Sequence, residues 1–294
     1  MATGIVSVAA ADHGYDALSD VLIALAAVAL PVLIAAAAAT WGRESWRLTD
    51  LEVSIPLCTY IAACAVVGAR LGSHRIVLWV LGAMALQGWL SLAPVVVRGL
   101  WRNRAVLNDR VRGGWELASV ATSGIAILAA DLKIVFLAVL FWVVAIGVYL
   151  LMTGLIIWRA IHDASAPELV QPDIWILMGA AAIATLAGDH IDEAGLRSIW
   201  PVTVVTWCVA TAWLPPLIYI TMQRFRRRRV LAPGVWWAAV FPLGMYSSAT
   251  YATAVETGWR WLTTVSLVVF WIAFAAWTLT VLHALLRFRR VRSR

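Results

Sequence analysis

The sequence has little charge for its length. Only 13% of the 294 residues are charged, whereas 63% are hydrophobic and the mean hydropathy is +0.85. A soluble domain of this length could not bury so much apolar surface, so the composition excludes a soluble globular protein. The apolar runs are long and uninterrupted, which favours α-helices over the short alternating strands of a membrane β-barrel. The composition therefore predicts an all-α integral membrane protein.

The sequence also lacks the groups that catalysis, metal binding or nucleotide use would need. It has no nucleophile motif, no Walker motif and no phosphate-binding glycine loop, which argues against ATP-driven pumping. Its five histidines are scattered, and its three cysteines lie in apolar runs without metal-ligand spacing. We therefore expect no enzyme activity, no metal and no cofactor. The alternative is a membrane-embedded enzyme, whose only candidate groups are His283, Cys58, Cys64 and Cys208.

Ten apolar runs predict ten transmembrane helices in five hairpins, because about 20 apolar residues are enough to cross a bilayer. The first run, residues 1–10, is too short, so we expect that the sequence begins inside its first helix. The other predicted spans are 21–41, 51–68, 76–97, 113–130, 134–158, 174–188, 198–223, 236–255 and 261–286. The predicted hairpins occupy about residues 1–50, 51–112, 113–171, 172–232 and 233–294 of a single transmembrane domain.

The hairpins repeat along the chain. Spans begin near Leu51, Gly113, Pro172 and Pro233, at intervals of 62, 59 and 61 residues, which indicates an internal repeat. The odd-numbered spans are rich in small residues, and three have uncharged cores of 17, 14 and 15 residues, whereas the even-numbered spans are longer and bulkier. We therefore predict an inner ring of odd-numbered helices around a pore, shielded by an outer ring. Close packing of small-residue helices without a pore is the alternative.

The ninth span, residues 236–255, has the composition of a helix that lines a water-filled path. It has no charge, and small or hydroxyl side chains cover much of it. Pro242 removes a backbone hydrogen bond and, with Gly244, predicts a kink. Phe241 places one bulky ring directly before this kink. We predict that Phe241 narrows the pore; the alternative is a packing residue beside the proline.

Hydroxyl residues of the odd-numbered spans form the predicted pore lining. Hydroxyls and helix dipoles attract an anion but let it leave, and no basic residue lies inside these spans to hold it. No carboxylate lies at mid-membrane, as a cation pathway would need, so the residues favour an anion or a neutral solute. The predicted lining residues are Thr3, Ser7, Ser54, Thr59, Ser119, Thr122, Ser123, Thr185, Ser247 and Ser248.

Acidic residues near the span ends have two interpretations. Glu116 and Asp173 lie at the starts of the fifth and seventh spans, where a carboxylate is favoured by the helix dipole. The alternative makes one of them a proton or anion gate at the pore mouth. The acidic stretch from Asp189 to Glu193 could bind a cation, but its pattern favours a solvated loop.

Arginines predict the orientation. Of the 23 basic residues, 18 lie in the loops after even-numbered spans or in the tail. The positive-inside rule places these loops and the C-terminus in the cytoplasm. This clustering also explains the net charge of +7, so we expect no nucleic-acid partner.

Several motifs resemble one known family. The ninth span reads Trp-Trp-x-x-x-Phe-Pro-Leu-x-x-x-x-x-Ala-Thr, residues 120–123 read Val-Ala-Thr-Ser, and residues 172–180 read Pro-Asp-Ile-Trp-Ile-Leu-Met-Gly-Ala. With the Met-x-Thr-Gly-Ile start, these motifs resemble the tellurite-resistance/dicarboxylate transporter family. This family includes bacterial tellurite-resistance channels, fungal malate permeases and plant slow anion channels. The resemblance extends over nearly the whole chain.

The resemblance implies a pore within each protomer, a homotrimer, and a phenylalanine at Phe241 that blocks the pore. It also implies passage of C4-dicarboxylates such as malate, or of sulphite, nitrate, chloride or tellurite. We therefore predict a multi-pass protein of the plasma membrane that moves small anions, passively or with protons. A non-conducting membrane scaffold or sensor is the alternative.

Overall fold

The computed structural model describes residues 1–41, 48, 50–102, 111–162, 171–226 and 237–292, which form ten α-helices and no strand. Eight of the described helices are long and apolar enough to cross a membrane, which confirms the predicted all-α membrane fold. The 3₁₀ turns η1 (Gly113–Glu116), η3 (Pro172–Trp175) and η4 (Arg197–Ile199) lead into α6, α8 and α9. The α-helices are α1 (Ala2–Asp12), α2 (Asp16–Trp41), α3 (Leu51–Arg70), α4 (Arg75–Arg102), α6 (Leu117–Asp131), α7 (Val135–His162), α8 (Ile176–Glu193), α9 (Trp200–Arg226), α10 (Trp237–Thr257) and α11 (Arg260–Arg292).

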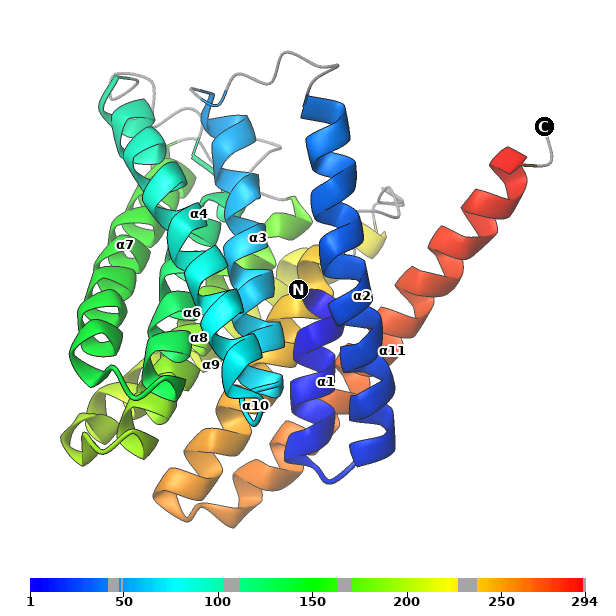
Figure 1. Cartoon of the computed structure of the whole chain (residues 1–294). Coiled ribbons are helices and arrows are strands. Elements are labelled where there is room, and N and C mark those ends of the chain that lie inside the picture. Colours follow the sequence, from blue (N-terminus) through cyan, green and yellow to red (C-terminus); the bar gives the residue numbers. More distant parts are fainter. Residues whose placement is uncertain (42–47, 49, 103–110, 163–170, 227–236, 293–294) are drawn as a thin grey trace.

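The helices pack as five pairs, α1 with α2, α3 with α4, α6 with α7, α8 with α9 and α10 with α11. The short turns within these pairs all lie at the lower end of the molecule in Figure 1, which we call the turn end. The opposite end, where α3 begins and α2 ends, we call the loop end. That the five hairpins are repeats of one unit stays a prediction.

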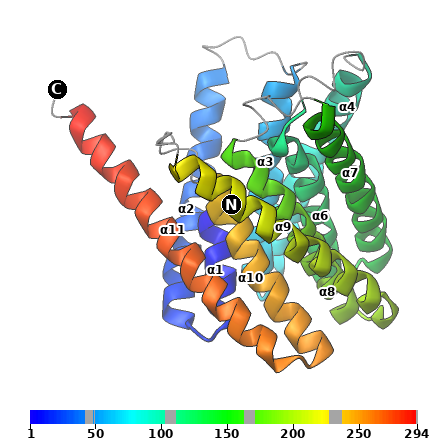
Figure 2. The same ribbon diagram turned by 180° about the vertical axis from the view of Figure 1, so that it is seen from behind.

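Five helices form a closed ring, in which α1 packs on α3, α3 on α6, α6 on α8, α8 on α10 and α10 on α1. We call these the inner helices, and α2, α4, α7, α9 and α11 the outer helices. The most apolar stretches of the spans that contain α3, α6 and α8 are 67%, 89% and 89% buried, against 17–33% for the outer helices. The two opposite views of Figures 1 and 2 show α2, α4, α7 and α11 at the periphery.

Small residues let the inner helices approach closely. A Cβ added to Gly124 of α6 would lie 2.8 Å from the Cβ of Ala65 in α3. One added to Gly244 of α10 would lie 2.9 Å from Ile5 of α1. Larger side chains cannot enter these contacts, which explains why the inner helices are poor in bulky residues.

Several element boundaries differ from the predicted ones. The outer helices α4 and α11 extend beyond the predicted spans, because their ends continue as helix on the loop side. Helices α3 and α10 remain continuous through Pro56 and Pro242. The predicted loop at residues 189–193 was wrong, since α8 continues to Glu193.

Part of the orientation prediction falls outside the described residues. The predicted start of the ninth span at Trp236 also lies outside the described residues. The undescribed loop and tail arginines are Arg43, Arg47, Arg104, Arg110, Arg227, Arg228, Arg229 and Arg294.

The close contact at Gly124 predicts that alanine has opposite effects on stability at Gly124 and at Gly147. Gly124→Ala should destabilise the protein by about 1–3 kcal/mol, because the new methyl group meets the Ala65 Cβ. Gly147 of α7 has open space around its Cβ position, so Gly147→Ala should stabilise by about 0.5–1 kcal/mol through helix propensity. Thermal unfolding in detergent measures both variants. Shifts of the same sign would contradict the ring packing.

Candidate functional site

The flanks of α10 are fixed by its two neighbours in the ring. Gly244 lies against Ile5 of α1. On the other flank, Pro242 lies against Gly179 of α8, where an added Cβ would be 3.1 Å from the proline ring. The two residues of the predicted kink therefore pack on the neighbouring inner helices.

The outward face of α10 is fixed by hydrogen bonds to outer helices. The Ser247 hydroxyl donates to the Ser266 carbonyl of α11 at 2.9 Å, and the Tyr246 hydroxyl lies 2.9 Å from Thr211 Oγ1 of α9. Successive residues of a helix are rotated by about 100°. The remaining face of α10, directed to the interior of the ring, therefore carries Phe241 and, two turns further, Ser248.

Phe241 is a buried aromatic residue on this inward face of α10. It is only 1% exposed and belongs to the hydrophobic core. A buried aromatic ring in this position is what a hydrophobic constriction requires.

Reciprocal serine pairs join inner to outer helices in the first and last hairpins. Ser7 Oγ donates to the Ser19 carbonyl and Ser19 Oγ donates back to the Ser7 carbonyl, both at 2.8 Å. Ser247 and Ser266 form the same pair, at 2.9 and 2.7 Å. Each of these hydroxyls donates its proton to the carbonyl of the partner helix. Serine and threonine commonly join membrane helices in this way.

Four more of the predicted lining residues make contacts with outer helices. They share one arrangement, in which the side chain hydrogen bonds to the hairpin partner or to another outer helix. The pairs are Ser119 Oγ with the Ala145 carbonyl (2.9 Å), Thr185 with Thr206 (2.9 Å), Thr122 with Trp89 Nε1 (3.0 Å) and Thr3 with Trp277 Nε1 (3.0 Å). We do not propose these residues, or Ser7 and Ser247, as pore lining.

Three of the predicted lining serines are not used in hydrogen bonds between helices and remain candidates for the pore lining. Ser54, Ser123 and Ser248 are buried, and their hydroxyls have no well-formed hydrogen bond to the described residues. An unsatisfied buried polar group costs about 1–3 kcal/mol, so water or an anion inside the ring would stabilise these hydroxyls. Thr59 is half-buried and donates to the Pro56 carbonyl of its own helix at 2.6 Å.

The two predicted mouth carboxylates lie at the loop end but differ in their contacts. Glu116 is fully buried, and its Oε1 accepts a 2.6 Å hydrogen bond from Thr153 of α7. Asp173 accepts from the backbone N–H of Gly114 at 3.1 Å and so ties the turns η1 and η3 together. Arg112, 3.8 Å from Asp173, also pairs with Glu52.

A set of polar side chains at the turn end was missed by the sequence analysis. His190 Nδ1 of α8 lies 2.6 Å from Asp131 Oδ1 of α6. Ser248 of α10, Arg70 of α3 and His190 belong to the electrostatic environment of the Asp12 carboxylate of α1. We call Asp12, Arg70, Asp131, His190 and Ser248 the turn-end cluster. Every inner helix contributes one member, and only the fold brings them together.

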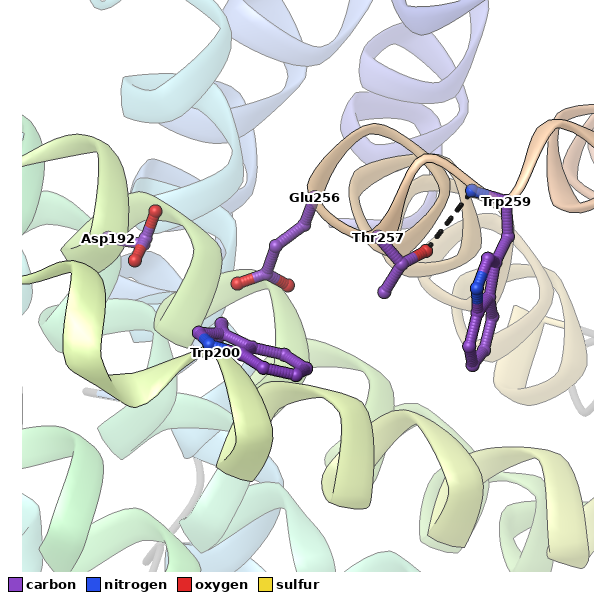
Figure 3. Close-up of a pocket in the computed structure, with 5 residues that line it drawn as sticks. All are labelled: Asp192, Trp200, Glu256, Thr257 and Trp259. Carbon is purple, nitrogen blue, oxygen red and sulfur yellow. Dashed lines mark hydrogen bonds between the residues drawn. The ribbon is translucent and has the colours of Figure 1, made fainter.

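An acidic cleft opens beside this cluster, where α8, α9 and α10 meet. It has a volume of about 390 Å³ and is lined by Asp192, Trp200, Glu256, Thr257 and Trp259. Figure 3 shows the side chain of Glu256 extending toward the side of the cleft on which Asp192 lies. Thr203 Oγ1 donates to Glu256 at 3.0 Å. Within the described residues, no group of three His, Cys, Asp or Glu side chains could hold a metal ion.

Comparison with known proteins decides the class. A sequence model of the SLAC1 family, described as a voltage-dependent anion channel, matches residues 1–285. The chain belongs to this family. The resemblance read from the motifs is thereby confirmed, because the SLAC1 family is the tellurite-resistance/dicarboxylate transporter family.

Relatives of this SLAC1-family chain carry membrane and transport names. An uncharacterized membrane protein of Mycobacterium tuberculosis is 30% identical over 45% of this chain and 72% of its own length. Two uncharacterized transporters of Methanocaldococcus jannaschii are each 21% identical, over 71% and 76% of this chain and 65% and 70% of their own lengths. The protein is therefore a multi-pass membrane protein of an anion channel and transporter family.

Neighbouring serines of α10 provide a test of the site geometry. Ser247→Ala should destabilise the SLAC1-family fold by about 0.6–1.7 kcal/mol, because it removes an interhelical hydrogen bond. Ser248→Ala removes a hydroxyl without a well-formed partner and should be neutral or stabilising. Denaturant unfolding in mild detergent measures both. Equal destabilisation would show that the two side chains have been assigned to the wrong faces.

Proposed function

We propose that this protein moves small anions through the interior of the ring of inner helices, with Phe241 as the constriction. The observation that supports the proposal is the position of Phe241, which is 1% exposed and lies on the inward face of α10, while Pro242, Gly244 and Ser247 pack on neighbouring helices. Inorganic anions and C4-dicarboxylates are the substrates that the family resemblance implies.

The charge distribution along the ring supports an anion as the cargo. In the described part of the inner helices, the only side chains of basic residue types are Arg70 and His190, both at the turn end. Helices α3, α6, α8 and α10 all begin at the loop end, so their partial positive N-termini converge there. An anion entering from the loop end therefore meets a favourable potential and no fixed cation that would trap it.

We propose that the loop end faces the cytoplasm and that the protein lies in the plasma membrane. The loop-end connections and the C-terminal tail carry 18 of the 23 basic residues, which is the asymmetry that the positive-inside rule describes. We further propose a homotrimer, as the family resemblance implies. Light scattering of the detergent-solubilised protein measures the number of protomers.

The proposed constriction predicts a gain of function. Phe241→Ala should raise nitrate or malate flux into liposomes on the order of tenfold, because removal of the ring allows water to enter the constriction. Phe270→Ala is the matched control, since Phe270 is equally buried but belongs to the outer helix α11. The assay follows anion-dependent swelling or an anion-sensitive dye.

The outcomes separate the proposed function from its alternatives. Equal flux from Phe241→Ala and Phe270→Ala would remove Phe241 as the constriction. No flux in any variant, with folded protein confirmed, would favour a scaffold or sensor.

A proton-coupled carrier is the second candidate, and Glu116 supports it. Glu116 is a fully buried carboxyl group at the loop end, and its Oε2 has no hydrogen bond to a described residue. Such a group can take up a proton when an anion binds. In a carrier, a pH gradient would drive malate uphill and Glu116→Gln would abolish this driving force. In a channel, malate would only run down its own gradient in both proteins.

A further inference from the structure

The Asp12 carboxylate is directed into the interior of the ring. Asp12 is the last residue of α1, whose neighbours in the ring are α3 and α10. Thr3 of the same helix accepts a hydrogen bond from Trp277 of the outer helix α11, and nine residues at about 100° each place Asp12 on the opposite, inward face of α1. The electrostatic influence of His190 of α8 on the Asp12 carboxylate agrees with this inward direction.

Asp12 and Phe241 lie at different depths along the axis of the ring of inner helices. Asp12 and Ser248 both belong to the turn-end cluster, and Ser248 lies on the inward face of α10 that also carries Phe241. Seven residues separate Phe241 from Ser248, which is two helical turns or about 10 Å along the axis. An anion that passes Phe241 toward the turn end therefore meets Asp12 next.

The basic side chains near Asp12, namely Arg70 and His190, are each paired with another carboxylate. Arg70 pairs with Asp20 at 3.1 Å and also donates to Ser19 at 2.7 Å. His190 is hydrogen bonded to Asp131. Asp12 itself forms no ion pair with a described residue, and its Oδ2 is sealed from solvent. The ionised carboxylate therefore remains a net negative charge at the turn end of the path.

Other groups around Asp12 do not compensate this charge. From α2, the exposed Asp16 and Asp20 are also acidic. On the α11 side, His13 Nε2 hydrogen bonds with Ser266 at 2.9 Å, and burial lowers the pKa of this histidine below its usual value, although the hydrogen bond opposes the shift. His13 is therefore neutral near pH 7, and the acidic cleft beside α10 adds further negative potential.

We propose that Asp12 is a second, electrostatic determinant of permeation, which repels anions at the turn end while it is ionised and admits them when it is protonated. The proposal rests on the proposed function, because it presumes that anions cross the ring. It makes anion flux depend on pH even for an anion whose own charge does not change, since the barrier disappears with the charge on Asp12.

The test measures nitrate flux in liposomes that carry Phe241→Ala, so that the aromatic constriction does not mask the second barrier. Nitrate stays ionised at both pH values, and equal pH on the two sides makes the inserted orientation irrelevant. Flux should rise from near-neutral pH to about pH 5, where carboxyl groups of raised pKa take up protons. Adding Asp12→Asn should raise the near-neutral flux on the order of tenfold, the scale of one unit charge in a poorly solvated mouth, and should remove the pH response.

Two further variants make the result specific. Asp16→Asn removes an exposed carboxylate only four residues away and should leave both flux and pH response unchanged. Asp12→Glu keeps the charge and should retain the pH response, which separates the loss of charge from a packing defect. Size-exclusion chromatography verifies that each variant is folded.

The results distinguish the two proposals. A pH response that survives Asp12→Asn, or an absence of any response in the Phe241→Ala protein, would overturn the role of Asp12 and leave the anion path standing. No nitrate flux through folded Phe241→Ala protein at either pH would overturn the proposed function itself, and the role of Asp12 with it.

Discussion

The close approach of the five inner helices is the constraint on which the rest of the structure depends. A methyl group at Gly124 or Gly244 would already lie within 3 Å of a neighbouring helix. Helices with such small faces cannot bury their remaining surface alone, so longer and bulkier outer helices enclose them. Phe241 is a bulky, buried aromatic residue on the inward face of α10, among the small residues of that helix, and for this reason we propose it as the constriction.

The hairpin arrangement also produces an electrical asymmetry. All five turns lie at one end, so α3, α6, α8 and α10 present their N-termini to the loop end and the inner helices present their C-termini to the turn end. Asp12 and Glu256 add negative charge at the turn end. The two ends of the ring therefore differ in electrostatic potential, which is the basis of the proposed asymmetry for anions.

The sequence could not distinguish hydroxyl groups that join helices from hydroxyl groups that face the interior of the ring. Ser247 and Ser248 are adjacent and chemically identical, so their composition predicted the same role for both. In the fold, the first donates to the Ser266 carbonyl and the second faces the ring interior. Similarly, Ser119 and Thr122 were grouped with Ser123, yet both hydrogen bond to outer helices. A hydroxyl-rich helix has the same composition whether its polar groups join helices or line a path.

The sequence by itself determined the membrane class, the pairing of spans, the contrast between inner and outer helices, and Phe241 as the exceptional ring. These properties follow from local hydropathy and residue size, which each span carries independently of its neighbours. Only the tertiary structure decided which serines remain unpaired and that Asp12, Arg70, Asp131, His190 and Ser248 meet at one end. That meeting depends on the rotation of each helix about its axis, and this rotation is set by contacts between segments that lie far apart in the chain.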